Sequence, residues 1–418
     1  EGDLFFALTG ENSDGHKFLA DALMKGASGL VVSRKVEAKC LAIRVEDTLL
    51  ALGALASYYR DKFNPDVVGV TGSVGKTTTK EMIAAVCASR GPVLKNAGNF
   101  NNEIGLPLTL FGLSSRHKTA VVEMAMRGSG QIAYLAQIAK PSIGVITNVH
   151  LSHVELLGSL DAIAEAKGEL LDHLPKDGYA VLNADDAYFE YFSKRSKCNV
   201  FSFGESKNAD VRAISSGIDS KGCNFEVHTP NGGFYVVVPV PGEHNIADAL
   251  SAIAVADILG VDHDNIKEAL ASYKPPEKRS TIIPSRRGYV VIDDSYNASP
   301  PSMMSALKTL SMMEGGRKIA ILGDMLELGD FAIDSHTEIG QLVSALNIDI
   351  LFVVGDLSKL IARSALDSGM PISSVFTFDD SVRAAREIAG VVKEQDVVLV
   401  KGSRAMKMER IVEGLLAT

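Results

Sequence analysis

The residue types best suited to chemistry gather in a glycine-spaced segment at 71–78. This segment, Thr-Gly-Ser-Val-Gly-Lys-Thr-Thr, follows a β-branched apolar run and precedes apolar residues at helical spacing, an order that predicts a strand, a loop and a helix. Its glycines let backbone N–H groups turn inward toward phosphate oxygens, while Lys76 offers a positive charge and Thr77 a hydroxyl for Mg²⁺. The segment therefore predicts binding of ATP or GTP. The residues expected to form the nucleotide loop are Thr71, Gly72, Ser73, Val74, Gly75, Lys76, Thr77 and Thr78.

The loop differs from the usual phosphate-binding pattern G-x-x-x-x-G-K-[ST] at its first glycine. Val70 stands five residues before Gly75, and the nearer glycine is Gly72, so we interpret the loop as a shortened variant. The alternative is an ordinary glycine turn with a solvated lysine. The order of strand, glycines, Gly-Lys-Thr and helix favours phosphate binding.

Two further side chains stand where a shared Mg²⁺ could be held. Glu123 follows the apolar run at 119–122, and ligands of open parallel sheets gather at such strand ends, although a solvated loop acid fits the position equally well. His153 lies shortly after the predicted strand at 142–147, without further ligands at zinc-like spacing. On the residues alone, a capping role for this histidine is the simpler interpretation.

Lys167 falls on the apolar stripe of a predicted helix at 161–174. It comes four residues after Ile163, on the face that also carries Leu170, Leu171 and Leu174. An ammonium group resists burial, so such a lysine is either paired or chemically altered, or it snorkels to the edge of the stripe. Spacing alone favours snorkelling.

Other polar residues follow predicted strands or open predicted helices. Amides in one loop can bind phosphoryl and hydroxyl oxygens, a cationic loop can bind a carboxylate, and the same residue types also serve as ordinary caps and turns. These candidates are Asn99, Asn101 and Asn102 in one loop, Asn245 at a helix start, Arg279 beyond Pro275-Pro276, Asp294, Tyr296 and Asn297 after a strand, Asp324 after another, and Lys401, Ser403 and Arg404 in a cationic loop.

The totals indicate a globular protein with more than one core. The chain has 418 residues, of which 46% are hydrophobic and 22% charged, and its net charge of -9 argues against a general nucleic-acid surface. Four scattered cysteines without a C-x-x-C pair fit a reducing cytoplasm, and no apolar run is long enough to insert into a membrane. We expect a cytoplasmic monomer. The sequence begins at Glu1 without Met, so its start is expected to be trimmed.

Strands alternate with helices through most of the chain, which predicts α/β units built on mainly parallel sheets. Turn-forming residues near Asn64-Pro65 and Pro275-Pro276 divide it into three expected domains, at 1–63, 64–278 and 279–418. Within the second domain, glycine-punctuated strands between 200 and 240 predict an antiparallel excursion. The third domain is expected to be Rossmann-like, with polar residues after its strands.

These motifs together resemble the Mur ligases, over nearly the whole chain and in family order. The matching segments are Thr-Gly-Ser-Val-Gly-Lys-Thr-Thr at 71–78, Gly-Asn-Phe-Asn-Asn-Glu-Ile-Gly-Leu-Pro at 98–107, Glu123, His-Val-Glu-Leu-Leu-Gly-Ser at 153–159, Ala-Lys-Gly-Glu at 166–169, Gly-Glu-His-Asn at 242–245, Asp-Asp-Ser-Tyr-Asn-Ala at 293–298 and Leu-Gly-Asp-Met-Leu-Glu-Leu-Gly at 322–329. The last two segments, and the absence of a D-x-N-P-R motif, favour the branch that adds D-alanyl-D-alanine to UDP-N-acetylmuramoyl-tripeptide.

The resemblance implies a first domain that holds the UDP end, a central ATPase and a third domain that closes over ATP and brings the amine. It implies that Lys76 and Thr77 serve phosphates and Mg²⁺, that Glu123 and His153 are metal ligands, and that Lys167 is carbamylated. Asn245, Arg279, Asp294 and Asn297 are then ATP contacts, while Asn99 and Asn102 face the muramoyl nucleotide. The stretch that precedes Gly-Asp-Leu-Phe in the family, which helps to bind uridine, is missing before Glu1.

The reaction implied is attack of a peptide carboxylate on ATP, giving an acyl phosphate that the amine of the dipeptide then attacks. Two alternatives remain. Another Mur-type ligase such as folylpolyglutamate synthase would bind a pteridine in place of a UDP-sugar. A P-loop switch without ligase activity would hydrolyse ATP without coupling it to amide formation.

Overall fold

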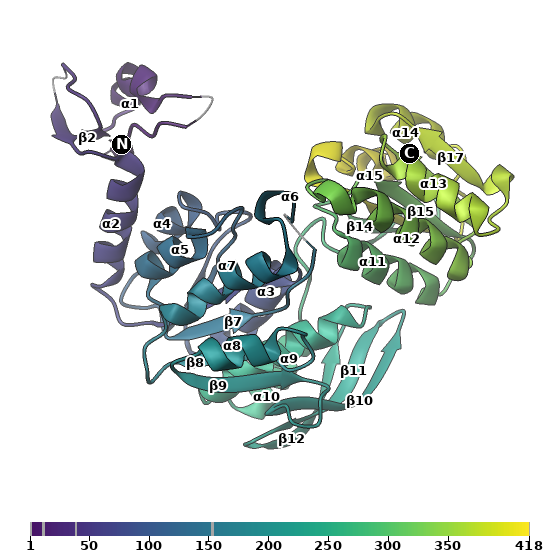
Figure 1. Ribbon diagram of the computed structural model, residues 1–418, viewed down its shortest axis with the longest axis horizontal. Coiled ribbons are helices and arrows are strands. Elements are labelled where there is room, and N and C mark those ends of the chain that lie inside the picture. Colours follow the sequence, from purple (N-terminus) through teal and green to yellow (C-terminus); the bar gives the residue numbers. More distant parts are fainter. Residues whose placement is uncertain (1, 11–12, 38–39, 152–153, 418) are drawn as a thin grey trace.

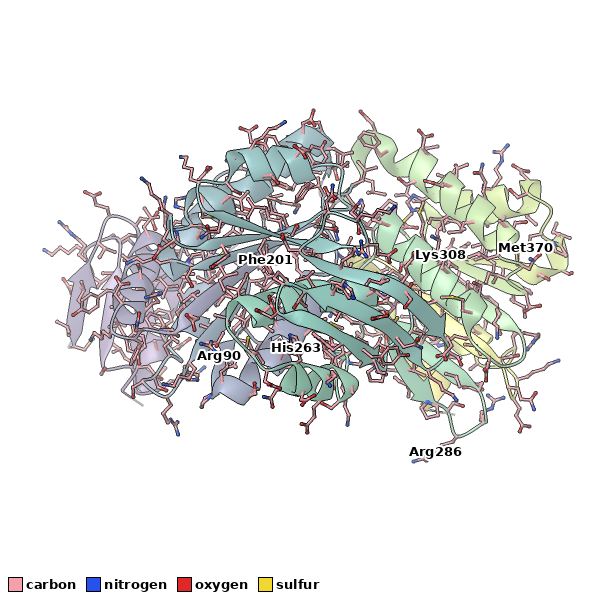
Figure 2. The ribbon with its side chains drawn as sticks, turned by 90° about the horizontal axis from the view of Figure 1, so that it is seen from below. Arg90, Phe201, His263, Arg286, Lys308 and Met370 are labelled. Atoms are coloured by element: carbon pink, nitrogen blue, oxygen red, sulfur yellow. The ribbon has the colours of Figure 1, made fainter. Side chains whose placement is uncertain are left out.

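The computed structural model describes residues 2–10, 13–37, 40–151 and 154–417, and over these residues the chain forms three β-sheets. Figure 1 shows the three parts in chain order, with α2 leading from the first sheet to the central one and the C-terminal part beside the central one. Figure 2 shows the same three parts in the same order, seen from below, with Phe201 and His263 in the central part and Lys308 and Met370 in the C-terminal part. The α/β fold class is confirmed. The predicted domain limits stay a prediction.

The first sheet is small and parallel, in the order β1-β2-β3. Its core is correspondingly thin, with Leu30 and Val32 of β2 fully or almost fully buried. This small sheet agrees with the α/β units expected from the sequence, whereas β3, whose residues are exposed, and α2 were not predicted. The elements are β1 (Leu4–Phe6), η1 (Gly15–Phe18), α1 (Leu19–Met24), β2 (Gly29–Val32), β3 (Leu41–Arg44) and α2 (Thr48–Arg60).

The central sheet has the order β12-β11-β10-β9-β8-β7-β4-β6-β5 within the described residues. Successive residues of a strand point to opposite faces, so Val68 and Val70 of β4 enter one core while Val67 enters the other. The strands are β4 (Asp66–Thr71), β5 (Val93–Lys95), β6 (Thr119–Glu123), β7 (Ile143–Ile146), β8 (Tyr179–Asn183), β9 (Asn199–Gly204), β10 (Val211–Asp219), β11 (Gly222–Thr229) and β12 (Gly232–Val238).

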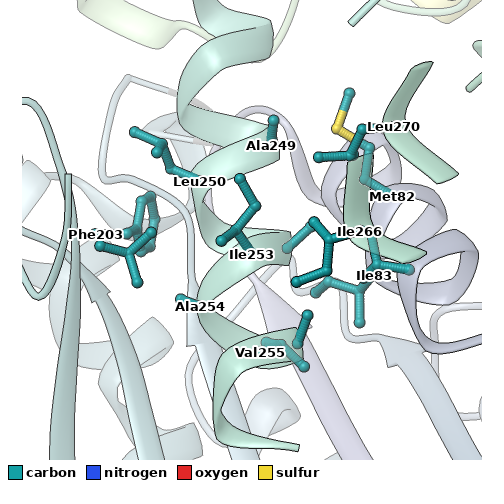
Figure 3. Packing of buried hydrophobic residues seen from close by; sticks show 14 of the residues in the cluster. Met82, Ile83, Phe203, Ala249, Leu250, Ile253, Ala254, Val255, Ile266 and Leu270 are labelled. Carbon is teal, nitrogen blue, oxygen red and sulfur yellow. The ribbon is translucent and has the colours of Figure 1, made fainter. Parts of the chain in front are cut away.

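Helices cover both faces of this sheet, and α9 is almost wholly buried against it. In Figure 3, Phe203 lies on one side of α9, while Ile83 and Ile266 lie on the other, so α9 packs between the sheet and the helices α3 and α10. The helices are α3 (Lys76–Cys87), η2 (Ala88–Arg90), α4 (Gly105–Leu110), α5 (Gln131–Ala139), α6 (Val154–Leu157), α7 (Leu160–Asp172), α8 (Phe189–Arg195), α9 (His244–Ile258) and α10 (His263–Ala271).

The antiparallel excursion expected between 200 and 240 is wrong in its first part. β9 pairs in parallel with both β8 and β10, and only β10, β11 and β12 pair antiparallel. These strands continue the central sheet instead of leaving it. Glycine turns marked the hairpins correctly, but the partner of β9 is fixed by packing against α9 and not by local sequence.

The third sheet is parallel except at one edge, in the order β13-β14-β18-β15-β16-β17. The mainly parallel sheet expected for this domain is confirmed, whereas the antiparallel edge strand β13, which ends in a proline, was not predicted. The elements are β13 (Thr281–Pro284), β14 (Val290–Asp294), α11 (Pro300–Met312), β15 (Lys318–Gly323), η3 (Gly329–Phe331), α12 (Ala332–Ala345), β16 (Ile350–Val354), α13 (Ser358–Asp367), η4 (Ile372–Ser374), β17 (Val375–Phe378), α14 (Ser381–Ile388), β18 (Val397–Lys401), η5 (Arg404–Met406) and α15 (Glu409–Leu416).

Side-chain and backbone contacts join the central and C-terminal parts near the carboxyl ends of their strands. His244 Nδ1 lies 2.6 Å from Ser305 Oγ of α11, and Glu155 N donates to Glu327 O at 3.4 Å. No helix in the described part of the chain is long and apolar enough to cross a membrane.

Candidate active site at the phosphate-binding loop

The loop between β4 and α3 has the backbone that its glycines predict. Gly75, which caps α3, has φ +84°, and Gly72 has φ +151°, both in the region that favours glycine. A Cβ at Gly72 would lie 1.9 Å from Thr147 Oγ1, and one at Gly75 would lie 2.4 Å from Asp248 Oδ1. No larger residue fits either position. The first N–H groups of α3, which starts at Lys76, are thus left open toward an anion.

Residues after β7 hold the loop in this shape. Asn148 Oδ1 accepts from Val74 N at 2.9 Å, and its Nδ2 donates to Val74 O at 3.1 Å. Ser73 Oγ donates to His150 O at 2.9 Å and accepts from His150 N at 2.9 Å. Asn148 was not predicted, and its position directly after a buried strand is the signal that could have found it.

Lys76 folds back over the loop. Its Nζ donates to Gly72 O at 2.8 Å and to Ser73 O at 3.0 Å. Burial lowers its pKa, Glu123 partly opposes that effect, and Arg279 adds to it. Within the described part of the chain, the partners of this amine are these two carbonyl oxygens, and phosphate oxygens would be stronger ones.

Glu123 is fixed at every polar atom. Its carboxylate, on a side chain that is 2% exposed, accepts from Thr77 Oγ1 at Oε2 and from Asn101 Nδ2 at Oε1, each at 2.8 Å. Its backbone N donates to Asn96 Oδ1 at 2.9 Å, and Asn96 Nδ2 donates to its backbone O at 3.0 Å. The alternative interpretation, that Glu123 is a solvated loop acid, is therefore wrong. Asn96 was not predicted.

A buried carboxylate beside a hydroxyl at a helix N-terminus suits Mg²⁺, which prefers a few oxygen ligands and keeps waters in its remaining positions. Thr77 and Glu123 provide this pair. His153, the third predicted ligand, lies outside the described residues. Within the described part, three His, Cys, Asp or Glu side chains do not gather as a metal-binding group, so a zinc-like cage is not present there.

Glu123→Gln tests this assignment. The amide keeps the shape but loses the negative charge, so we expect the Mg²⁺ concentration for half-maximal activity to rise and kcat to fall on the order of 10²-fold. Titration of bound Mn²⁺ by its electron paramagnetic signal, in the presence of ADP, measures the metal directly. Unchanged Mn²⁺ affinity would show that Glu123 only supports the loop.

Lys167 of α7 is buried, at 2% exposed, so the snorkelling interpretation is wrong. Burial and the charge of Lys76 lower its pKa well below the usual value, which favours the neutral amine. Among the described residues, no carboxylate forms an ion pair with it. Sequence spacing placed the lysine on the correct face, but only the packed helix shows that its amine stays inside.

The three asparagines predicted near a substrate have different positions. Asn101 contacts Glu123, as described above. Asn102 Oδ1 accepts from Gly105 N at 2.9 Å and so caps α4, whereas Asn99 is exposed. Their predicted contacts with substrate stay predictions.

Arg279 brings the start of the C-terminal part to the loop. Its guanidinium lies 4.1 Å from the ring centroid of Tyr296, and its charge affects the pKa of both Lys76 and Asp248. Lys278 and Ser280, on either side, have φ +63° and +51°, an unfavourable backbone for non-glycine residues. Strain of this kind is typical of functional positions.

The carboxyl ends of the third sheet gather the remaining candidates. Lys401 Nζ donates to Asp294 Oδ2 at 2.5 Å and to Asn297 O at 3.0 Å, and Arg404 pairs with Glu409 at 2.8 Å. The carboxylates that these cations contact are thus the chain's own. That the cationic loop binds a substrate carboxylate stays a prediction.

Asp324 and Ser403 hold the neighbouring loops. Asp324 Oδ1 accepts from Ser358 N at 2.7 Å, and Ser403 Oγ accepts from Leu326 N at 2.9 Å. Both side chains are buried. These contacts hold the loops after β15 and β18 in place at the carboxyl ends of the third sheet.

A cavity of about 540 Å³ opens beside the phosphate-binding loop. Its wall is formed by the loop, by the segments after β7 and β8, and by the first two turns of α9, so it has the position that a nucleotide bound to the loop requires. Asn245 is buried beside it and donates from Nδ2 to Pro241 O at 3.1 Å. Residues lining the cavity include Val74, Gly75, Asn148, His150, Asp185, Asp186, Tyr188, His244 and Asp248.

Comparison with known proteins identifies the family to which this sequence belongs. The model for the Mur ligase middle domain matches residues 70–256, and that for the Mur ligase, glutamate ligase domain matches residues 278–404. A relative from Synechocystis sp. named UDP-N-acetylmuramoyl-tripeptide--D-alanyl-D-alanine ligase is 40% identical over 422 residues, covering 100% of this chain and 89% of the relative. An Escherichia coli protein of the same name is 37% identical over 418 residues, covering 99% of this chain and 91% of its own length.

Solved structures agree. MurF from Acinetobacter baumannii superposes with a TM-score of 0.92 at 32% identity, covering 100% of this chain and 91% of that one. MurF ligase from Thermotoga maritima in complex with ADP gives a TM-score of 0.88 at 30% identity, covering 100% and 95%. Family models match both the central and the C-terminal part, and curated relatives match nearly the whole length at 37% to 40% identity, so the chain belongs to the Mur ligases.

Proposed function

We propose that this protein is an ATP-dependent, ADP-forming ligase that joins D-alanyl-D-alanine to UDP-N-acetylmuramoyl-tripeptide, in the cytoplasmic synthesis of peptidoglycan precursors. The observation that carries the proposal is the arrangement of Lys76, Glu123, Lys167 and Arg279 around one phosphate-binding loop. The names of relatives that match nearly the whole chain support the choice of substrates. Its cosubstrate is ATP with Mg²⁺.

The first step is attack of the terminal tripeptide carboxylate on the γ-phosphorus of ATP. One carboxylate oxygen forms the new P–O bond, and ADP leaves with the electron pair of the broken bond. Because both reactants are anions, Lys76, Arg279 and the N-terminus of α3 must offset the charge that they bring together. Mg²⁺ held by Thr77 and Glu123 would neutralise phosphate charge when bound.

The second step is attack by the amine of D-alanyl-D-alanine on the acyl phosphate carbonyl. The amide bond forms, inorganic phosphate leaves, and the amine loses its proton to solvent or a nearby base. The contacts of the central and C-terminal parts at His244–Ser305 and Glu155–Glu327 set the distance at which the two substrates meet. Exclusion of water from this interface would protect the acyl phosphate from hydrolysis.

Lys167 is proposed to act as its carbamate. A neutral amine attacks carbon dioxide and loses one proton, which converts a buried potential cation into an anion beside Lys76. The strongly lowered pKa of Lys167 and its burial near that second cation support this change. As a carbamate it would attract Lys76 instead of repelling it.

The parts of the chain divide the substrates between them in this proposal. Residues 1–63 serve the UDP end, 64–278 bind ATP, and 279–418 complete the ATP site and bind the dipeptide. The protein acts as a monomer. Proposed ATP contacts are Asn245, Arg279, Asp294, Tyr296 and Asn297; proposed substrate contacts are Asn99, Asn101, Asn102, Asp324, Lys401, Ser403 and Arg404; and His153 is the proposed third metal ligand.

Phosphate release measured with UDP-N-acetylmuramoyl-tripeptide, with and without D-alanyl-D-alanine, tests this function. We expect rapid phosphate release only when both substrates and ATP are present, with one peptide product for each phosphate. Phosphate release that ignores both substrates would indicate a P-loop hydrolase. Turnover with a pteridine substrate in place of the UDP-sugar would indicate a folylpolyglutamate synthase. The solved folylpolyglutamate synthase of Mycobacterium tuberculosis is similar to this chain in fold alone, at 16% identity and a TM-score of 0.67.

A further inference from the structure

Asp248 is a buried acid with an unused oxygen at the nucleotide cavity. It lies in the second turn of α9, is 5% exposed, and accepts from Thr79 Oγ1 at 2.9 Å through Oδ1. Its Oδ2 is buried and has no hydrogen-bond partner within the described part of the chain. A buried polar atom without a partner is costly, so this oxygen is a candidate for contact with a ligand.

The carboxylate also lies directly against the phosphate-binding loop. A Cβ built on Gly75 would approach Asp248 Oδ1 to 2.4 Å, and both residues line the cavity of about 540 Å³. Any nucleotide whose phosphates occupy the loop therefore brings negative charge next to Asp248. Two negative charges at short distance in a water-poor site repel strongly.

Burial already favours the neutral form of this acid. It raises the pKa of Asp248 to about 7, although the hydrogen bond from Thr79 and the charge of Arg279 act in the opposite direction. No ion pair holds the carboxylate within the described residues. The negative charge of bound phosphates would raise the pKa of Asp248 further, in the same direction as burial.

Other titratable groups surround Asp248. Burial lowers the pKa of both His150 and His244, so these imidazoles are mainly neutral at pH 7 and above. The titratable or charged groups on the surrounding elements include Lys76, Lys80 and Glu81 of α3, Glu243 and His244 at the start of α9, Tyr273 and Arg279 after α10, and His150, Asp185 and Asp186 on the cavity wall.

From this geometry we propose that nucleotide binding is coupled to protonation of Asp248. A proton moves from solvent to Oδ2, no other bond forms or breaks, and the neutral carboxyl donates its hydrogen to the bound nucleotide. Asp248 then contacts the nucleotide directly, and it does so only when its own carboxyl group is protonated. The inference rests on the ATP site of the proposed function.

The sign of the pH dependence follows from linkage. The ligand binds the protonated form, so affinity is highest below the pKa of the free protein and falls as pH rises above it. Above that pKa, the apparent Kd increases by up to about tenfold for each pH unit. An asparagine at this position is always neutral and removes the dependence.

Calorimetric titration with ADP at saturating Mg²⁺, in two buffers of different ionisation enthalpy at pH 8, measures the proton directly. We expect uptake of about one proton per ADP by the unaltered protein and almost none by Asp248→Asn. The matched control is Asp257→Asn. Asp257 is a second buried carboxylate of α9, outside the lining of this cavity, and its Oδ1 accepts from Thr229 Oγ1 at 3.1 Å and from Asn231 Nδ2 at 2.9 Å, so proton uptake should match that of the unaltered protein.

The pH dependence of ADP affinity in the unaltered protein gives a second measurement that needs no variant. We expect the apparent Kd to rise about tenfold between pH 7.5 and 8.5. A flat profile, or equal proton uptake in the unaltered protein and Asp248→Asn, would overturn the coupling while leaving the ATP site intact. Failure of ADP to bind at any pH would overturn the proposed function together with this inference.

Discussion

Lys76→Ala is expected to lower kcat/KM for ATP by about three orders of magnitude, the largest effect of any single change in the loop. Lys76 Nζ already stands over the loop, donating to Gly72 O and Ser73 O, so it reaches bound phosphate by a small side-chain movement. Its loss removes the fixed cation that offsets the electrostatic repulsion between the substrate carboxylate and the triphosphate of ATP. Steady-state phosphate release with both substrates measures the effect.

Lys95→Ala is the matched control for that change. Lys95 lies on β5, about half exposed, and pairs with the side chain of Glu81 of α3. Turnover close to that of the unaltered protein is expected. Near-normal ADP release that still depends on both substrates in Lys76→Ala would refute the role of Lys76, whereas equal losses in both variants would indicate a general effect of lost charge.

Replacement of Lys167 with alanine is expected to lower kcat by about 10² to 10³-fold, because the site loses the anion that a carbamate supplies near Lys76. The unaltered enzyme should lose activity in buffer freed of carbon dioxide and regain it when bicarbonate is added. Lys167→Ala should show neither response. The measurement is phosphate release against bicarbonate concentration.

Lys194→Ala serves as the control for this second change, since Lys194 is exposed on α8 and should leave both activity and its bicarbonate response unaltered. Thermal unfolding of each variant separates catalytic loss from misfolding. Full activity in Lys167→Ala would leave the buried amine without a role in turnover.

Much of the fold followed from local patterns. The β-branched run at 67–70 ends at a glycine turn, and the strand and helix on either side follow directly from that order. Parallel strands bring their carboxyl ends to one edge, so Glu123 and Asp294 could be selected as site residues from position alone. The edge strand β13 was missed because it has four residues, of which two are partly buried, and ends in a proline, so its periodicity is too short to indicate a strand.

The supporting residues could not be predicted in the same way. Asn96 holds Glu123 from 27 residues away, and Asp248 contacts Thr79 across 169 residues. Amides and carboxylates of this kind look like ordinary turn or helix residues in sequence, and only the packed structure gives them partners. Lys167 is an intermediate case. Its spacing in the sequence placed it on the apolar face of its helix, but only the structure shows that its amine is buried.

Transfer of ¹⁸O tests the central claim most directly. UDP-N-acetylmuramoyl-tripeptide labelled with ¹⁸O in its terminal carboxylate is converted with ATP and D-alanyl-D-alanine, and the inorganic phosphate is examined by mass spectrometry. An acyl phosphate requires one labelled oxygen to leave with the phosphate while the other stays in the new amide. Unlabelled phosphate released together with peptide product would contradict activation of the carboxylate by ATP.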